Sequence, residues 1–142
     1  MKILNKKARF NYEILNEIEA GIVLVGTEIK SIRNGLAQIN DSFVRIKNNE
    51  AFIVNMHISK YEQGNIFNHD ETRERKLLLH KREIKKLKNE VDRDGISLVP
   101  LSLYIKNGKA KILVGVGKGK KIFDKKEVIK KRDLEREARY YK

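Results

Sequence analysis

Basic side chains alternate with aromatic ones close to the start of the sequence. The stretch NKKARFNY (5–12) carries the cations Lys6, Lys7 and Arg9 beside the rings of Phe10 and Tyr12. Cationic groups can contact phosphates while aromatic rings stack on unpaired bases. The pattern therefore favours a nucleic-acid contact surface. The alternative interpretation is a charged chain end that leads into an ordinary strand.

A single carboxylate, Glu19, stands just before Ala20-Gly21, between two apolar runs. One carboxylate without a partner is weak support for acid–base catalysis. Two interpretations stay open at this point. Glu19 is either a solvated strand end, since most charged residues are exposed, or a group that accepts hydrogen bonds from a neighbouring base or arginine.

Other kinds of chemistry lack the residues they need. The chain has no cysteine, which excludes disulfides, thiolate nucleophiles and Cys-based metal sites. The histidines His57, His69 and His80 stand 12 and 11 residues apart, without carboxylates at metal-ligand spacing. The segment GVGKGKK (115–121) ends in Lys121 where a phosphate loop needs Ser or Thr. No serine lies in a G-x-S-x-G motif. We expect no catalytic residue, no metal and no cofactor.

The charge balance of the chain is strongly basic. The 142 residues include 32 Lys or Arg and 19 Asp or Glu, which gives a formal net charge of +13. Polyanions are the natural partners of such a chain, with nucleic acid first and an anionic membrane surface second. The first residues lack the apolar core of a signal peptide, and no run approaches the ~20 apolar residues of a membrane span. We expect a soluble, cytoplasmic protein with no membrane partner.

Basic residues are densest at the C-terminal end, where residues 118–142 hold eleven Lys or Arg and five Asp or Glu. Leu134, Ala138 and Tyr141 follow helical spacing. A stripe this thin cannot hold a helix alone in water. We expect a flexible tail that is disordered when free and helical when it lies against RNA.

The apolar pattern near the N-terminus predicts two strands and a helix. Strands over 12–18 and 22–25 are separated by a break at Ala20-Gly21. A helix then starts at an N-cap on Thr27 and ends at Asn34-Gly35. Lys30 and Arg33 share one face of this helix.

Two hairpins are predicted from their turn residues. Strands over 43–46 and 52–54 meet at Asn48-Asn49, and the second hairpin, over 95–117, turns at Asn107-Gly108. Pro100 marks an edge or a bulge in its first strand.

The part of the chain between the hairpins combines a loop, a strand and a helix. Residues 61–76 are polar and predict a long loop, in which RERK (73–76) is either a phosphate clamp or solvated. A short strand over 77–79 leads into a helix with an apolar stripe of Ile84, Leu87 and Val91. The lysines on its other face are those of any solvated helix.

About six strands in hairpins, with two short helices between them, predict a mainly β, α+β fold. A sheet this small closes most easily into an OB-like antiparallel barrel. We expect the barrel over residues 1–117 and the flexible basic tail over 118–142.

Three long segments resemble the SmpB family of SsrA-binding proteins, which act in bacterial trans-translation. They are NKKARFNYEILNEIEAGIVLVGTEIKSIRNGLAQINDSF, HISKYEQGNIFNHDETRERKLLLHKREI and LVPLSLYIKNGKAKILVGVGKGKKIFDKKE. The resemblance implies an OB-like barrel that binds the tRNA-like domain of transfer-messenger RNA (tmRNA, SsrA). It also implies delivery of the alanylated RNA with elongation factor Tu to stalled ribosomes. The tail would then occupy the decoding centre of the small subunit and the empty mRNA channel, and the protein would not be an enzyme.

The resemblance also implies site residues. The carboxylate of the family's EAG motif falls on Glu19, and the residue after LLL falls on His80. Together with the basic and aromatic residues above, the expected RNA-binding set is Asn5, Lys6, Lys7, Arg9, Tyr12, Glu19, Lys30, Arg33, Leu78 and His80. The expected ribosome-binding tail set is Lys118, Lys120, Lys121, Asp124, Lys125, Lys126, Lys130, Lys131, Arg132, Tyr140 and Tyr141.

Two alternative functions come from other classes. A basic module that binds nucleic acid or anionic membranes through charge alone would show little preference among RNAs and give Glu19 no special role. A hydrolase or nucleotide-binding enzyme would need a nucleophile, metal set or phosphate loop, and the sequence offers none.

Overall fold

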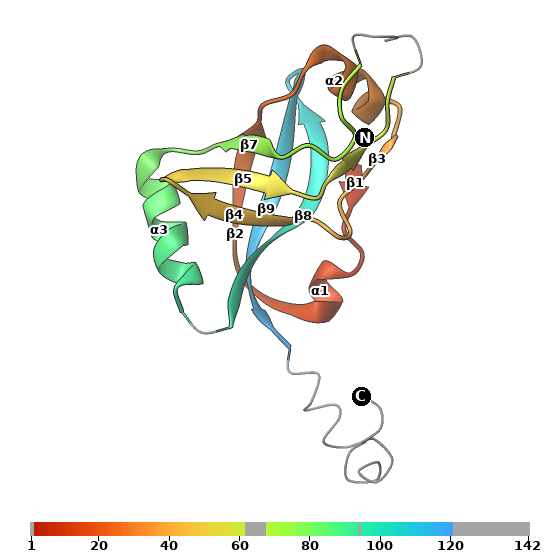
Figure 1. Cartoon of the computed structure of the whole chain (residues 1–142). Helices are drawn as coiled ribbons and strands as arrows, with labels where there is room; N and C mark the ends of the chain where they lie inside the picture. Colours follow the sequence, from red (N-terminus) through yellow and green to blue (C-terminus); the bar gives the residue numbers. More distant parts are fainter. Residues whose placement is uncertain (1, 62–67, 94, 121–142) are drawn as a thin grey trace, which may run out of the picture.

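The structure, a computed structural model, describes residues 2–61, 68–93 and 95–120 (Figure 1). Its strands are β1 (Lys2–Leu4), β2 (Tyr12–Ile22), β3 (Ala37–Gln38), β4 (Phe43–Lys47), β5 (Glu50–Val54), β6 (His57–Ile58), β7 (Arg75–Leu78), β8 (Ile96–Lys106) and β9 (Lys109–Gly119). The helices are α1 (Ala8–Asn11), α2 (Gly26–Arg33) and α3 (Lys81–Val91). The expected mainly β fold with short helices is confirmed.

The main sheet closes on itself. Its strands follow the order β1-β8-β4-β5-β7-β2-β9, and β8 and β9 also pair with each other. The strands other than β1 therefore form a ring, in the manner of an OB-like barrel, while β1 pairs with β8 outside it. The pairings are antiparallel. A closed ring leaves no row of unpaired backbone groups, because each strand has a neighbour on both sides.

Both predicted hairpins are confirmed. Asn48 and Asn49 have φ values of 54° and 63°, and Asn107 and Gly108 have 53° and 78°. Two successive residues with positive φ match the twist of an antiparallel hairpin, which is why Asn and Gly are favoured there. The register between β8 and β9 shifts between Pro100 and Ser102, so the predicted bulge is also present.

The N-terminal elements differ from the prediction in three places, the first being that no strand continues over residues 23–25. β2 runs through Ala20-Gly21 without a break, because both residues pair with β9. The next helix begins at Gly26 with Val25 as its N-cap, so Thr27 lies inside it. The Thr27 hydroxyl instead lies 2.9 Å from Nδ1 of His69. The described residues also hold more strands and helices than predicted, since α1, β1, β3 and β6 are short.

The barrel interior is filled by alternate residues of the strands that form the ring. Ile53, Leu77, Leu103, Ile112 and Val114 are all at most 1% exposed. The predicted stripe of α3 faces this core, with Leu87 in the main cluster and Val91 packed against it. A smaller cluster under α1 joins Ala8 to Val99 and Leu101.

The two arginines of the RERK segment make contacts within the fold, while Glu74 and Lys76 are exposed. Nε of Arg75 donates to Glu28 at 2.7 Å, and Nε of Arg73 donates to the same carboxylate at 2.9 Å. Neither Glu28 nor Arg75 is exposed. Burial alone would raise the pKa of Glu28, but hydrogen bonds from Arg73, the Val25 amide and Arg75 lower it overall. These arginines therefore tie α2 to β7.

Candidate nucleic-acid interface

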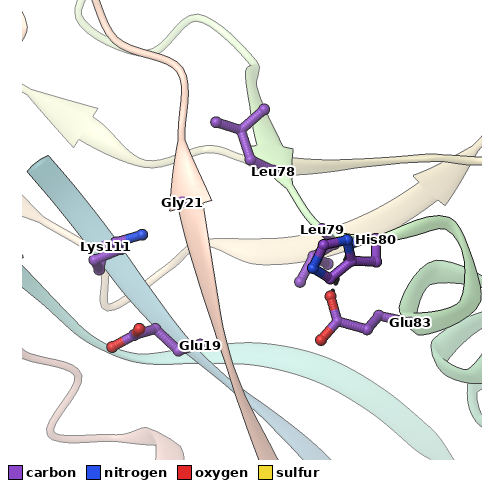
Figure 2. Close-up of a pocket in the computed structure, with 7 residues that line it drawn as sticks. All are labelled: Glu19, Gly21, Leu78, Leu79, His80, Glu83 and Lys111. Carbon is purple, nitrogen blue, oxygen red and sulfur yellow. Dashed lines mark hydrogen bonds between the residues drawn. The ribbon is translucent and has the colours of Figure 1, made fainter.

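A shallow hollow of ≈360 Å³ lies where β2 and β9 pass the junction of β7 and α3 (Figure 2). Its lining residues are Glu19, Gly21, Leu78, Leu79, His80, Glu83 and Lys111. It contains Glu19, Leu78 and His80, three residues that the sequence and the family resemblance single out for RNA binding. The structure therefore brings these three together from distant parts of the chain.

Glu19 is held from the β8 side of the hollow. The hydroxyl of Tyr104 donates a hydrogen bond to Oε2 of Glu19, and Nζ of Lys106 lies 3.7 Å from Oε1. The Tyr104 hydrogen bond is the main cause that lowers the pKa of Glu19; burial opposes it, and Lys106 and Lys111 add to it. Glu19 remains exposed, and its ionised carboxylate is held in place by Tyr104 and Lys106.

Leu78 forms the apolar side of the hollow. Its side chain is 56% exposed, although β7 belongs to the barrel. Gly21 is its register partner on β2, and a Cβ on Gly21 would lie 3.4 Å from the Leu78 side chain. The absence of a side chain at Gly21 therefore lets Leu78 lie close against the β2 backbone. An apolar surface of this kind suits the face of a base or ribose.

His80 is the N-cap residue of α3, at the strand–helix junction predicted from the sequence. Its backbone N–H donates to Oε1 of Glu83 at 2.8 Å. Glu83 is therefore engaged in capping the helix. The His80 ring is drawn beside the hollow in Figure 2, on the same side as Glu83.

The sequence analysis missed Tyr104, Lys106 and Lys111, the residues of β8 and β9 that surround Glu19. Lys111 lines the hollow opposite the β7–α3 junction. Their position on either side of the predicted Asn107-Gly108 turn could have indicated that they lie close together. Side chains two residues apart on a strand share a face, so Tyr104 and Lys106 lie together. The strand register that places β9 beside β2 cannot be predicted from the sequence.

The other expected RNA-binding residues lie at the two ends of the barrel. Lys6, Lys7 and Arg9 are exposed around α1, and Arg9 pairs with Glu17 at 2.7 Å. Tyr12 is half-buried beside this helix. Lys30 and Arg33 are exposed on α2, which Figure 1 draws at the opposite end from α1.

Asn5 differs from the other expected RNA-binding residues because it is only 8% exposed. Its amide donates to the carbonyl oxygens of Ile39 at 3.3 Å and Pro100 at 2.8 Å. Asn5 therefore shapes the turn before α1. A direct RNA contact from this residue stays a prediction.

The start of the expected tail belongs to the barrel. Lys118 lies in β9, which ends at Gly119. The backbone N–H of Lys120 donates to Asn11 at 2.9 Å, and its Nζ donates to the carbonyl of Arg9 at 3.0 Å. The remaining tail residues, Lys121, Asp124, Lys125, Lys126, Lys130, Lys131, Arg132, Tyr140 and Tyr141, lie outside the described residues.

The histidines occupy separate environments. His69 is 7% exposed and hydrogen-bonds with Thr27 and the carbonyl of Ile58. His57 lies 3.8 Å from Glu71 at the surface. Within the described ranges, no group of three His, Asp or Glu side chains could hold a metal ion. Among the same residues, no helix has the length and apolarity needed to cross a membrane.

Comparison with known proteins places the chain in a family. The family model described as SmpB protein matches residues 2–141. The SsrA-binding protein of Enterococcus faecalis is 59% identical over 133 residues, which cover 94% of this chain and 86% of that protein. The SsrA-binding protein of Shouchella clausii is 59% identical over 134 residues, with coverage of 94% and 86%.

A solved structure is also similar. A chain of the structure described as "tmRNA-SmpB: a journey to the center of the bacterial ribosome" matches with a TM-score of 0.72 and 45% sequence identity. The match covers 84% of this chain and 85% of that chain. The sequence relatives, the family model and the fold agree, and this chain belongs to the SmpB family.

Proposed function

We propose that this protein is an RNA-binding adaptor of trans-translation that binds tmRNA and carries it to stalled ribosomes. The observation that carries the proposal is the 59% identity to SsrA-binding proteins over 94% of the chain. The 45% identity to the SmpB chain of a tmRNA–SmpB ribosome structure supports the same function. A protein that acts on bacterial ribosomes works in the cytoplasm.

The geometry of the hollow supports RNA as the ligand. Lys111 supplies a cation for a phosphate, Leu78 an apolar surface for a base or ribose, and Glu19 an acceptor for N–H or O–H donors. Phosphate contacts give affinity, while contacts to base edges and to the 2′-hydroxyl give specificity. The hollow therefore serves as the contact with the tRNA-like domain of tmRNA.

The basic residues at the two ends of the barrel extend this surface in the proposal. Lys6, Lys7 and Arg9 around α1 and Lys30 and Arg33 on α2 contact further RNA phosphates. The segment after Lys120 enters the decoding centre and the empty mRNA channel. Elongation factor Tu joins the complex through the alanylated RNA. The protein itself contributes no catalytic step.

Competition binding at fixed salt tests the proposal. Labelled tmRNA bound to the full chain is displaced either by unlabelled tmRNA or by an unrelated structured RNA of similar size. We expect tmRNA to compete at far lower concentrations. Equal competition would contradict the proposal and support the charge-only module that a net charge of +13 also favours.

A Glu19→Gln variant adds a second contrast. Removal of a negative charge tightens charge-only binding slightly, because repulsion from phosphates is lost. Specific binding through the hollow weakens instead, because the amide of Gln replaces an acceptor oxygen with a donor.

A further inference from the structure

Tyr104 and Glu19 meet across an intervening strand. Glu19 on β2 is opposite Leu113 of β9, while Tyr104 on β8 is opposite Lys111 of the same strand. The Tyr104 side chain therefore crosses β9 diagonally to donate its hydrogen bond to Oε2 of Glu19. The ring is itself covered by Lys2, whose Nζ lies 5.8 Å from the ring centroid.

We infer that Tyr104 is a positioning residue for RNA recognition, which fixes the Glu19 carboxylate at the rim of the hollow and leaves its other lone pairs to N–H or O–H donors of the RNA. The inference rests on the proposed function and identifies Tyr104 as the group that holds the Glu19 carboxylate in position for the RNA. The classes of RNA group that fit an ionised carboxylate are base amino or imino N–H groups and the ribose 2′-hydroxyl.

A carboxylate in an RNA interface needs this kind of support. The negative charge of Glu19 opposes binding of nearby phosphates, and a freely moving side chain must also lose rotamer freedom before it can accept a hydrogen bond from a base. Tyr104 restrains Glu19 with a neutral donor and so leaves the negative charge in place. Lys106, 3.7 Å from Oε1, restrains the other oxygen more weakly.

Tyr104 remains a donor throughout the working pH range. Burial, and next the hydrogen bond and charge of Glu19, raise the pKa of Tyr104 to about 12. The hydroxyl is therefore protonated around neutral pH, where Glu19 is ionised. The titratable or charged groups that face Glu19 are Tyr104 and Lys106 from β8, Lys111 from β9, and His80 and Glu83 from the β7–α3 junction.

The direct test is the affinity of Tyr104→Phe for the tRNA-like domain of tmRNA at neutral pH. We expect about tenfold weaker binding, the loss that one hydrogen bond to a charged group carries. Tyr61→Phe is the matched control, since it also removes a phenol hydroxyl and keeps the ring that Lys30 covers. We expect the control to bind like the unchanged protein.

A double variant separates positioning from any independent contact of Tyr104. If Tyr104 acts through Glu19, Tyr104→Phe costs nothing further in a Glu19→Gln background. Equal losses in both backgrounds would overturn the inference, as would unchanged affinity in the single variant. Glu19→Asp is a second probe that leaves Tyr104 in place: it keeps the charge but withdraws the carboxylate by one methylene. Affinity equal to the unchanged protein in Glu19→Asp would also overturn the inference.

The titration of Glu19 in the free protein is a measurement that a general loss of stability does not change. The carbon-13 shift of the Glu19 carboxyl reports its titration, and Tyr104→Phe should raise the pKa of Glu19 toward its ordinary value of 4.5. An unchanged titration would contradict the inference. Competition by unrelated RNA against the unchanged protein tests the proposed function separately. A protein that prefers tmRNA but is indifferent to Tyr104→Phe refutes the inference alone.

Discussion

The carboxylate of Glu28 and the guanidinium of Arg75 meet at 2.7 Å with neither side chain exposed. Arg75 also donates to the carbonyl oxygen of Met56 at 2.7 Å. Arg73, 32% exposed, completes the cluster from the solvent side at 2.6 Å. The cluster joins α2, the end of the β5–β6 connection and β7, so that three separate segments of the fold depend on one buried charge.

Loss of that charge should be costly. We expect Glu28→Gln to lower the free energy of unfolding by about 3–5 kcal/mol, because Arg75 is left as an uncompensated buried cation. Urea unfolding measures the change. Glu50→Gln is the matched control, since Glu50 pairs with Lys76 at 2.8 Å but both side chains are about half exposed. The control should lose about 0–1 kcal/mol. A small loss in Glu28→Gln would show that the cluster contributes little.

The same pair predicts a pH dependence. The pKa of Glu28 in the folded protein lies below its ordinary value of 4.5. The unfolded chain therefore takes up this proton first as pH falls, and the contribution of Glu28 to stability is complete above about pH 4.5 and lost below it. We expect the stability difference between the unchanged protein and Glu28→Gln to be constant near neutral pH and to shrink below about pH 4.5. A difference that grew on acidification would contradict this sign.

Gly117 marks a close approach of β9 to β2. A Cβ on Gly117 would lie 2.9 Å from Cβ of Tyr12, an atom that no rotamer change can move. We expect Gly117→Ala to destabilise the fold by about 1–3 kcal/mol through overpacking. Gly119 has no atom within 4 Å of such a Cβ, so Gly119→Ala should change stability by less than about 0.5 kcal/mol. Equal effects in thermal unfolding would contradict the predicted closeness.

The hollow should separate electrostatic from apolar contributions to RNA binding. We expect Lys111→Met to weaken tmRNA binding and to reduce the slope of log affinity against log salt by about 1. Leu78→Ala should weaken binding without a change in that slope, and with little loss of stability, because Leu78 is 56% exposed. Lys47→Met, an exposed lysine of β4 outside the hollow, is the control. Identical slopes for Lys111→Met and the control would exclude a phosphate contact at Lys111.

Truncation should separate the barrel from the tail. Because Lys120 hydrogen-bonds to α1, the cut belongs after it rather than after residue 117. We expect the chain 1–120 to keep its affinity for the tRNA-like domain and to lose the tagging of stalled nascent chains in a reconstituted translation assay. Tagging at the normal rate by the truncated chain would contradict the assigned role of the tail.

Local signals in the sequence account for the parts of the fold that were predicted. Asn48-Asn49 and Asn107-Gly108 carry their turn chemistry in the residues themselves, and the stripe of α3 is periodic. The predicted break at Ala20-Gly21 was wrong because strand pairing with β9 and β7 on either side outweighs the weak strand preference of these residues.

Contacts between distant segments were beyond the sequence. Arg73 and Arg75 lie 45 and 47 residues from Glu28, and no pattern in RERK indicates a buried partner. The residues of the candidate site also fall into a group that the sequence indicated and a group that it did not. Glu19 and His80 came from a family motif, whereas Tyr104 and Lys111 depend on a strand register that the sequence does not state.

β9 pairs with β2 on one side and with β8 on the other along most of its length. The chain leaves the barrel from the end of this strand, and the residues of the hollow lie near its beginning. A pull on the chain beyond Lys120 therefore acts along β9, at right angles to its hydrogen bonds. In this shear geometry the bonds of two ladders share the force and must break together. Tension generated at one end would reach Lys111, about 27 Å away along the strand, without a hinge to absorb it.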